Sequence, residues 1–300
     1  MEILATKVRN VQTTGRELPI MCTNTVTKAS SRSKDAKTVL LVLKNSIDRQ
    51  SLDVSGSVLA IGAGELDVSL LRSLGFSRVT TSNIEGSDTT FALDAENIEL
   101  PDNSYDVVFA HAVLHHCRSP HKAVTEMARI ARKHILFIEP NESLLMRLLM
   151  KMGFSFPYEL AAVWDSGYVA GGMRNGPIPN FIYRWNKNEL RKTLASGMPE
   201  RQWTVCAYPY WDFFVSEFEL AARKDTRLDV ITRIIGVKTF IHLLRFCQAV
   251  LNLLPFARMQ GNKFLGAARK GDLQPWIEPA GDGEYRMKKD GMRIARRAGG

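Results

Sequence analysis

The sequence predicts an α/β protein built on a doubly wound, mostly parallel sheet. Short apolar runs alternate with amphipathic helical patterns from residue 57 onward, and the first run ends in a Gly-x-Gly turn. Right-handed crossovers between parallel strands bring the carboxyl ends of the strands to one edge of the sheet. Ligands of such folds bind at that edge, so the same pattern predicts where a site lies.

Composition allows one large domain and excludes several kinds of protein. A chain of 300 residues that is 45% hydrophobic and 24% charged can bury a full core. Its four cysteines are far apart and form no Cys-x-x-Cys pair or Cys/His cluster, so we expect reduced thiols and no metal site. We find no signal peptide and no run of roughly twenty apolar residues, and we therefore expect a cytoplasmic protein.

The net charge of +9 is carried largely by the two ends of the chain. Basic termini are more often solvated than bound to a partner, so we do not expect a nucleic-acid site. We expect residues 1–32 to be loosely ordered and residues 271–300 to form a basic, disordered tail.

The elements follow from hydrophobic period and turn residues. A helix capped by Ser33 carries an apolar stripe through residues 36, 39, 40, 43 and 47. Next come strands over 57–61, 78–82, 90–93, 106–110 and 135–138, with helices over 65–74 and 120–132. The second half is less regular, with helices over 141–152 and 188–196, a mostly helical segment over 228–254, and strands over 203–208 and 263–268. Glycine and proline fill 167–180, which we interpret as a loop that can serve as a lid.

The turn after the first strand is the centre of the predicted site. Ile61, Gly62, Ala63 and Gly64 form a strand end and a Gly-x-Gly turn that a ligand can approach closely. A dinucleotide-binding turn would place a third glycine where this chain has Asp67, which argues against NAD or FAD. After the third strand come Asp94, Ala95 and Glu96, which place a carboxylate at the same edge, where it can accept a hydrogen bond from an adenine amino group.

Residues 58–140 resemble the class I S-adenosylmethionine-dependent methyltransferases, in particular the ubiquinone-biosynthesis-like group. The matching motifs, in order, are Ala60-Ile61-Gly62-Ala63-Gly64, Asp94-Ala95-Glu96 with residues 100–108, Val113-Leu114-His115-His116, and Glu126-Met127-Ala128-Arg129. The resemblance implies S-adenosylmethionine as cofactor and a seven-stranded sheet with an antiparallel last strand. Residues 33–270 then form the methyltransferase domain, with a cofactor half over 57–140 and an acceptor-shaping lid and helical insertion over 141–258.

The end of the second strand departs from this family. The family has an acidic residue there that accepts hydrogen bonds from both ribose hydroxyls, whereas this chain has Asn83, followed by Ile84. An amide accepts from one hydroxyl and presents a donor to the other, so we expect a weaker contact, unless Glu85 replaces it. Ala110 and His111 end the fourth strand at the same edge, and we include both among the cofactor contacts.

A hydroxyl acceptor needs a base, and the candidates are His111, His115 and Glu139. A structural role stays open for each: His115 and its neighbour His116 can pack beside the cofactor, and Glu139 can hydrogen-bond the next loop.

We therefore expect a methyltransferase for a small-molecule, lipid-linked or glycan-linked acceptor, methylated at oxygen. The alternative is a protein of this fold that has lost catalysis and serves as a binding or scaffold partner, which Asn83 and the uncertain base both suggest. Nucleic acid is a poor candidate because we find no Asn-Pro-Pro-Tyr-type motif. The segment 228–254 carries Lys238, His242 and Arg245 on one face, which is either a peripheral membrane contact or an ordinary solvated face. The sequence does not predict the oligomeric state.

Overall fold

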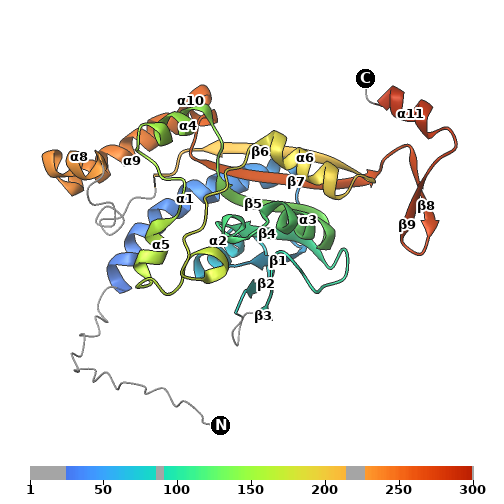
Figure 1. The fold of residues 1–300 in the computed structure, drawn as a ribbon, viewed down its shortest axis with the longest axis horizontal. Helices are drawn as coiled ribbons and strands as arrows, with labels where there is room; N and C mark the ends of the chain where they lie inside the picture. The colour runs from blue at the N-terminus through green and yellow to red at the C-terminus, as the bar shows by residue number, and fades with distance from the viewer. Residues whose placement is uncertain (1–24, 86–90, 214–226, 299–300) are drawn as a thin grey trace, which may run out of the picture.

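A seven-stranded sheet forms the centre of the protein (Figure 1). The computed structural model describes residues 25–85, 91–213 and 227–298. The strands are β1 (Ser57–Ile61), β2 (Arg78–Asn83), β3 (Phe91–Ala92), β4 (Tyr105–His111), β5 (Ala131–Pro140), β6 (Arg201–Tyr210) and β7 (Lys263–Leu273). Their order is β3-β2-β1-β4-β5-β7-β6, with β7 antiparallel to both β5 and β6. This confirms the predicted doubly wound, mostly parallel sheet with an antiparallel last strand.

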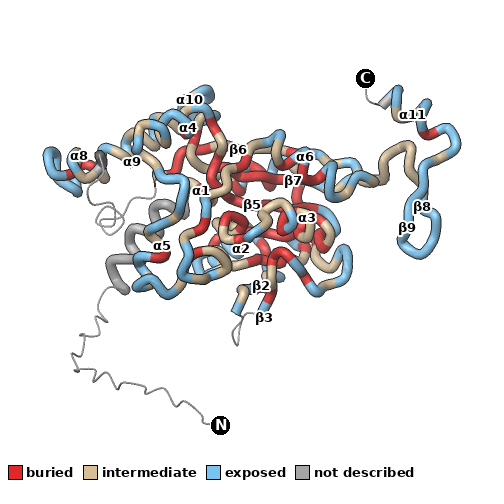
Figure 2. The backbone as a smooth tube through the Cα atoms, in the orientation of Figure 1, coloured by how far each residue is buried: buried red, intermediate tan, exposed pale blue. Residues whose placement is uncertain are grey.

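Helices cover both faces of the sheet. Successive residues of each strand point to opposite faces, so Leu59 of β1 enters one hydrophobic core and Val58 enters the other. The covering helices are α3 (Pro120–Ile130) and α6 (Lys187–Gly197) on the first core, and α1 (Thr25–Gln50) and α2 (Glu65–Ser73) on the second. Figure 2 shows that buried backbone is concentrated in the central strands and in the parts of these helices that face them.

Helix α1 begins at Thr25 rather than near Ser33. Part of the segment expected to be loosely ordered is therefore helical, and the rest of it, residues 1–24, lies outside the described residues. Residues 25–32 contain no glycine or proline, so the helix can extend from its packed part toward the N-terminus. The predicted stripe anchors it, because Val39, Leu43 and Ile47 are buried in the second core.

Strand β5 is longer than the expected 135–138. Helix α3 ends at Ile130, and Ala131 already pairs with Tyr105 of β4. The guanidinium of Arg132 donates to Asp106 of β4 at 2.9 Å, which holds the added residues against that strand. Residues 131–134, which precede the predicted strand, are therefore part of it.

The segment predicted to be mostly helical, 228–254, consists of α8 (Arg227–Ile235) and α9 (Val237–Leu253). Gly236 joins them with φ +83°, a conformation that favours glycine, and the two helices are bent by 108°. Among the described residues no single helix is long and apolar enough to cross a membrane. Taken together, the two helices of this bent pair are long and apolar enough, judged by length and composition alone. The remaining elements before β7 are α4 (Leu144–Lys151), α5 (Leu160–Asp165), the 3₁₀ turns η1 (Leu114–His116) and η2 (Met173–Asn175), and α10 (Pro255–Met259).

The C-terminal segment is folded, which differs from the disordered tail expected over 271–300. After β7 come a hairpin of β8 (Ile277–Gly281) and β9 (Glu284–Met287), and then α11 (Gly291–Ala298). Gly281, Asp282 and Gly283 all have positive φ, and Asp-Gly between two paired strands is a strong hairpin signal that the high charge of the segment obscured. The hairpin and α11 lie beyond the end of the main sheet (Figure 1).

Candidate active site

A cavity of about 350 Å³ opens at the carboxyl ends of β1 and β2, where the fold predicts a ligand. The loop after β4 and the loop over 171–175 complete its wall. The lining residues are Ile61, Gly62, Asn83, Ile84, Glu85, Leu93, Asp94, Ala95, Glu96, Ala112, Val113, His116, Cys117, Gly171, Arg174 and Asn175.

Most of the predicted cofactor contacts line this cavity: Ile61, Gly62, Asn83, Ile84, Asp94, Ala95 and Glu96. Four others are not among its described lining residues: Ala63, Gly64, Ala110 and His111. Gly64 precedes α2 as its N-terminal cap, and its N–H donates to Asp67 at 3.1 Å. Ala110 is fully buried in the first core.

The turn at Gly62 requires glycine for two reasons. Its φ of +61° lies in the left-handed region, which side chains with a Cβ rarely adopt. A Cβ there would also lie 2.6 Å from Cγ2 of Val113, in the loop after β4. The N–H of Gly62 donates to the carbonyl of Ser82 at 2.7 Å, so β1, β2 and the loop after β4 meet at this point.

Asp94 supplies a carboxylate to the cavity, and Arg174 approaches it from the opposite wall. One oxygen of Asp94 accepts from the N–H of Glu96 at 2.9 Å, and the other accepts from Arg174 at 2.8 Å. Arg174 also donates to Glu96 at 3.0 Å. Burial raises the pKa of Asp94, but the hydrogen bonds from Arg174 and Glu96 outweigh it and lower the pKa below its usual value. Asp94 is therefore an ionised acceptor, and its remaining lone pairs can take a hydrogen bond from an adenine amino group.

The glycine- and proline-rich stretch forms the outer wall of the cavity. It contains η2 and is tied to the cofactor half at three points, through Arg174, Asn175 and Gly172. The amide of Asn175 donates to Glu85 at 2.7 Å, and the carbonyl of Gly172 lies 3.1 Å from Nδ1 of His116. The stretch that we interpreted as a lid thus borders the predicted site.

At the end of β2, the side-chain oxygen of Asn83 accepts from the N–H of Ile84 at 2.9 Å. This backbone contact engages the oxygen that would otherwise face a ribose hydroxyl. Glu85, two residues further along the chain, also lines the cavity and offers a carboxylate there.

Two of the three candidate bases are held in structural contacts. His111 lies 2.8 Å from a carboxylate oxygen of Asp67 on α2. Glu139 is fully buried: one of its oxygens accepts from the N–H groups of Val113 and Leu114 at 2.9 and 2.7 Å, and the other contacts Nδ1 of His115. Glu139 thus holds the start of η1 and has no accessible oxygen for an acceptor.

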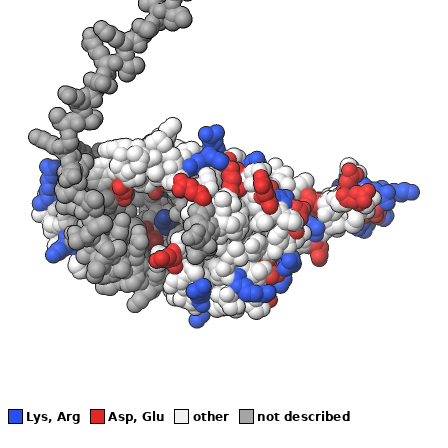
Figure 3. All heavy atoms as spheres, turned by 90° about the horizontal axis from the view of Figure 1, so that it is seen from below, with Lys and Arg blue, Asp and Glu red and all other residues white. Residues whose placement is uncertain are grey.

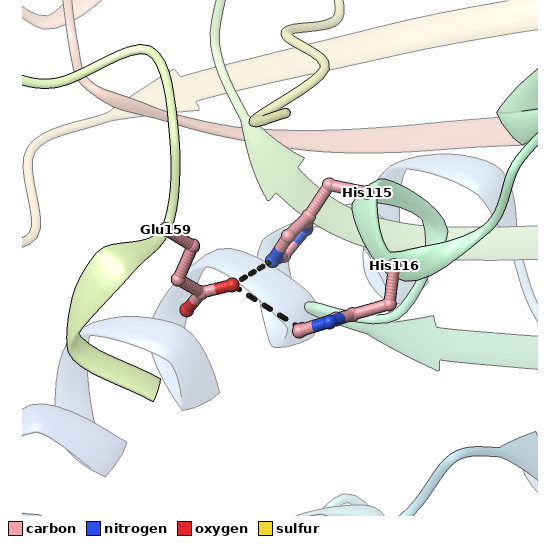
Figure 4. Close-up of side chains that lie close together, drawn as sticks. All are labelled: His115, His116 and Glu159. Atoms are coloured by element: carbon pink, nitrogen blue, oxygen red, sulfur yellow. Dashed lines mark ion pairs between the residues drawn. The ribbon is translucent and has the colours of Figure 1, made fainter. Parts of the chain in front are cut away.

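His115, His116 and Glu159 converge beside the cavity. The histidines project from η1, and Glu159 reaches them from the start of α5 (Figure 4). Its Oε2 lies 3.2 Å from Nε2 of His115 and 3.3 Å from Nε2 of His116.

Opposite charges surround the buried His115 ring. Burial lowers the pKa of His115, but Glu139 and Glu159 outweigh it and raise the pKa to about 9. Burial raises the pKa of Glu159, but the two histidines outweigh it and lower the pKa to about 2. In this arrangement His115 is an imidazolium at neutral pH, and it has no lone pair with which to take a proton from an acceptor.

Sequence reasoning missed Arg174, Asn175 and Glu159. All three lie in the less regular second half, far along the chain from the carboxylates and histidines that they contact. The glycines marked a loop there, but glycine spacing does not show which side chain a loop turns inward. His116, which the sequence predicts beside the cofactor, lines the cavity.

Comparison with known proteins finds a methyltransferase domain in the part of the chain that forms most of the central sheet. Residues 68–138 match the sequence profile of the methyltransferase domain family. No curated protein sequence matches the chain. Among solved structures, an S-adenosylmethionine-dependent methyltransferase from Thermotoga maritima is similar, with 14% identity, 81% of this chain and 95% of that chain covered, and a TM-score of 0.42. An S-adenosylmethionine-dependent methyltransferase from Mesorhizobium loti is 11% identical, with 74% of this chain and 94% of that chain covered and a TM-score of 0.38. The magnesium protoporphyrin IX methyltransferase from Synechocystis is 15% identical, with 64% of this chain and 83% of that chain covered and a TM-score of 0.37.

The strand order, with β7 antiparallel between β5 and β6, is consistent with the Rossmann-like methyltransferase fold. With this fold, the match over residues 68–138 indicates a methyltransferase domain of the class I, S-adenosylmethionine-dependent type. The cofactor of this class is S-adenosylmethionine.

Proposed function

We propose that this protein transfers a methyl group from S-adenosylmethionine to an oxygen of a small-molecule, lipid-linked or glycan-linked acceptor. The observation that carries the proposal is the cavity at the strand edge, which combines a close backbone approach at Gly62 with the ionised carboxylate of Asp94. When bound, the cofactor supplies a methyl group that is already activated on a positively charged sulfur. The protein then has to bind the cofactor and align the acceptor.

The residues present fit that cofactor. The turn at Gly62 presents backbone without a side chain, and Asp94 offers lone pairs to an adenine amino group. Glu85 is placed to accept from a ribose hydroxyl, with Asn83 beside it. His116 lines the same cavity, so it borders both the cofactor and the place from which an acceptor would approach.

The helical insertion favours a lipid-linked acceptor among these classes. Leu243, Phe246, Val250 and Leu253 are exposed along one side of α9, and Phe256 of α10 is 87% exposed. Exposed residues Lys238 and His242 lie on the same helix. An exposed apolar stripe with basic neighbours suits a helix that lies on an anionic membrane surface, where a lipid-linked acceptor would be presented. On the face that Figure 3 shows, the described basic and acidic side chains are interspersed, which suits nucleic acid poorly.

Methyl transfer tests this proposal directly. The purified protein is incubated with methyl-labelled S-adenosylmethionine and either a lipid extract or a polar small-molecule extract of its source cells. We expect label in an organic-soluble product with the wild-type protein and none with Asp94→Ala. If the protein binds the cofactor product but labels nothing in either extract, the result supports the non-catalytic scaffold alternative.

A further inference from the structure

The trio of His115, His116 and Glu159 has the spacing of metal ligands (Figure 4). Its three ligand atoms all lie within 4.8 Å of one another. Zinc–nitrogen and zinc–oxygen bonds of about 2.0–2.1 Å place neighbouring ligands of a tetrahedral ion roughly 3.3 Å apart. The carboxylate oxygen lies 3.2 and 3.3 Å from the two imidazole nitrogens, so both distances agree with that spacing.

Oε2 of Glu159 lies close to both imidazoles. Its Oε2 is buried, yet among the described residues it has no partner in hydrogen-bonding geometry, although two imidazole nitrogens lie close to it. Figure 4 shows both histidine rings beside the carboxylate of Glu159, with dashed lines marking the two ion pairs.

The second nitrogen of each ring, Nδ1, contacts a hydrogen-bond acceptor, as it commonly does in metal-binding histidines. Nδ1 of His115 contacts the carboxylate of Glu139, and Nδ1 of His116 lies 3.1 Å from the carbonyl oxygen of Gly172. Both partners are acceptors, so each Nδ1 can keep a proton, and if a metal ion took the place of the His115 Nε2 proton, both rings would direct an Nε2 lone pair at it. Carboxylate and carbonyl groups of this kind orient histidine ligands in metal sites.

Two lone pairs and a carboxylate that face one point repel each other unless a positive charge lies between them. A proton on His115 is one way to supply that charge, and a metal ion is the other. Two imidazoles and one carboxylate are a ligand set that binds Zn²⁺ in catalytic sites, with further positions left for water or substrate. The side chains of His116 and Glu159 are 28% and 32% exposed, so parts of both reach solvent although Oε2 itself is buried.

We propose that His115 Nε2, His116 Nε2 and Glu159 Oε2 bind one divalent metal ion of the Zn²⁺ type. Because the sequence contains no Cys/His cluster, it predicted no metal site. The fold, however, brings Glu159 next to His115 and His116, which are far from it in the sequence. Because His116 also lines the cavity, an acceptor oxygen on the open side of the ion would be held beside the cofactor. The ion would lower the pKa of that hydroxyl so that its proton could pass to solvent water, and the oxygen could then accept the methyl group without a histidine base. This role rests on the proposed function, whereas metal binding does not.

Zinc titration of the full-length protein tests the site without any methyl transfer. After treatment with a chelator, the protein is titrated with ZnCl₂ in a calorimeter at neutral pH, and Co²⁺ absorption reports the ligands. We expect one ion per chain, and we expect Glu159→Gln and His116→Ala each to weaken binding by about tenfold or more. His115 is 5% exposed and is left unchanged, because its replacement could prevent folding.

His242→Ala is the matched control, because His242 is an exposed histidine on α9 outside the cavity. It should bind the ion as tightly as the wild-type protein. If the wild-type protein binds no ion, or if the Glu159 and His116 variants bind as tightly as the control, then a protonated His115 holds the cluster and the proposal is wrong. Binding of S-adenosylhomocysteine by a protein that binds no zinc would leave the proposed function standing while removing the metal site.

Discussion

At the scale of single residues, Gly62 and Gly64 flank the same turn but face different constraints. A Cβ at Gly62 would meet Val113 and would require φ +61°, whereas a Cβ at Gly64 would meet no protein atom within 4 Å. Gly62→Ala should therefore lower the free energy of unfolding by about 2 kcal/mol or more. Gly64→Ala should change it by less than about 0.5 kcal/mol. Urea denaturation of the two variants measures the difference, and equal losses would mean that the turn is not built as described.

Asp94 is the predicted acceptor for the adenine amino group of the cofactor. Asp94→Ala removes the acceptor for an adenine amino group, so S-adenosylhomocysteine should bind at least about tenfold more weakly by calorimetry. The fold should persist, because the ion pair between Asp94 and Arg174 is partly exposed and such pairs contribute at most about 1 kcal/mol. Asp290→Ala, next to α11, is the control and should bind normally. Normal binding by Asp94→Ala would remove this carboxylate from the site.

At the scale of elements, β5 carries a group that makes stability depend on pH. Burial of His134, together with the charges of Arg269 and Lys133, lowers the pKa of the imidazole from 6.5 to about 4. The unfolded chain therefore binds a proton near pH 6.5 and the folded chain only near pH 4, so stability is complete above pH 6.5 and is lost as pH falls toward 4. One pKa unit corresponds to about 1.4 kcal/mol, and the loss should approach about 3 kcal/mol.

The variant His134→Leu tests this contribution. It should lose less stability than the wild-type protein between pH 7 and pH 4.5, measured by urea denaturation at several pH values. His242→Leu, on the exposed side of α9, should follow the wild-type curve. Parallel curves for all three proteins would show that His134 is not buried as a neutral ring.

Elements with a strong period were predictable from sequence, and their ends were not. The stripe of α1 and the apolar runs of β1 and β4 report burial directly, because one face of each element must be apolar. The early start of β5 depends on the pairing of Arg132 with Asp106, and such a contact between two strands leaves no local pattern. The cofactor side of the cavity was predictable for the same reason as the strands, since its residues follow strand ends. Glu159 and Arg174 were not predictable, because tertiary contacts alone bring them there.

At the scale of the whole molecule, the hairpin β8–β9 and α11 form an extension from the sheet (Figure 1). Arg201 and Tyr285 make one of the contacts between β6 and the hairpin, with the guanidinium carbon 6.0 Å from the ring centroid. A chain that ends at residue 274 should keep its affinity for S-adenosylhomocysteine within about twofold. Its thermal unfolding midpoint should fall by only a few degrees, because the truncation removes few contacts with the sheet. A large loss of either would mean that the extension supports the sheet or the site.

The net charge of the chain was a poor guide to the structure of its C-terminal segment. A net charge of +9 with basic ends predicted a disordered tail, yet the positive-φ turn at 281–283 specifies a hairpin inside that tail. Net charge describes solubility and long-range attraction rather than fold, so turn residues were the better guide.

The most direct test of the whole account is calorimetric titration of the full-length protein with S-adenosylhomocysteine, with NAD as the control ligand. We predict one site per chain of micromolar or tighter affinity for S-adenosylhomocysteine and no binding of NAD. Tight binding would show that the cavity accepts the cofactor despite Asn83 at the end of β2 and Arg174 against Asp94. Failure to bind S-adenosylhomocysteine would contradict the account and would indicate a protein that keeps the methyltransferase fold for another purpose.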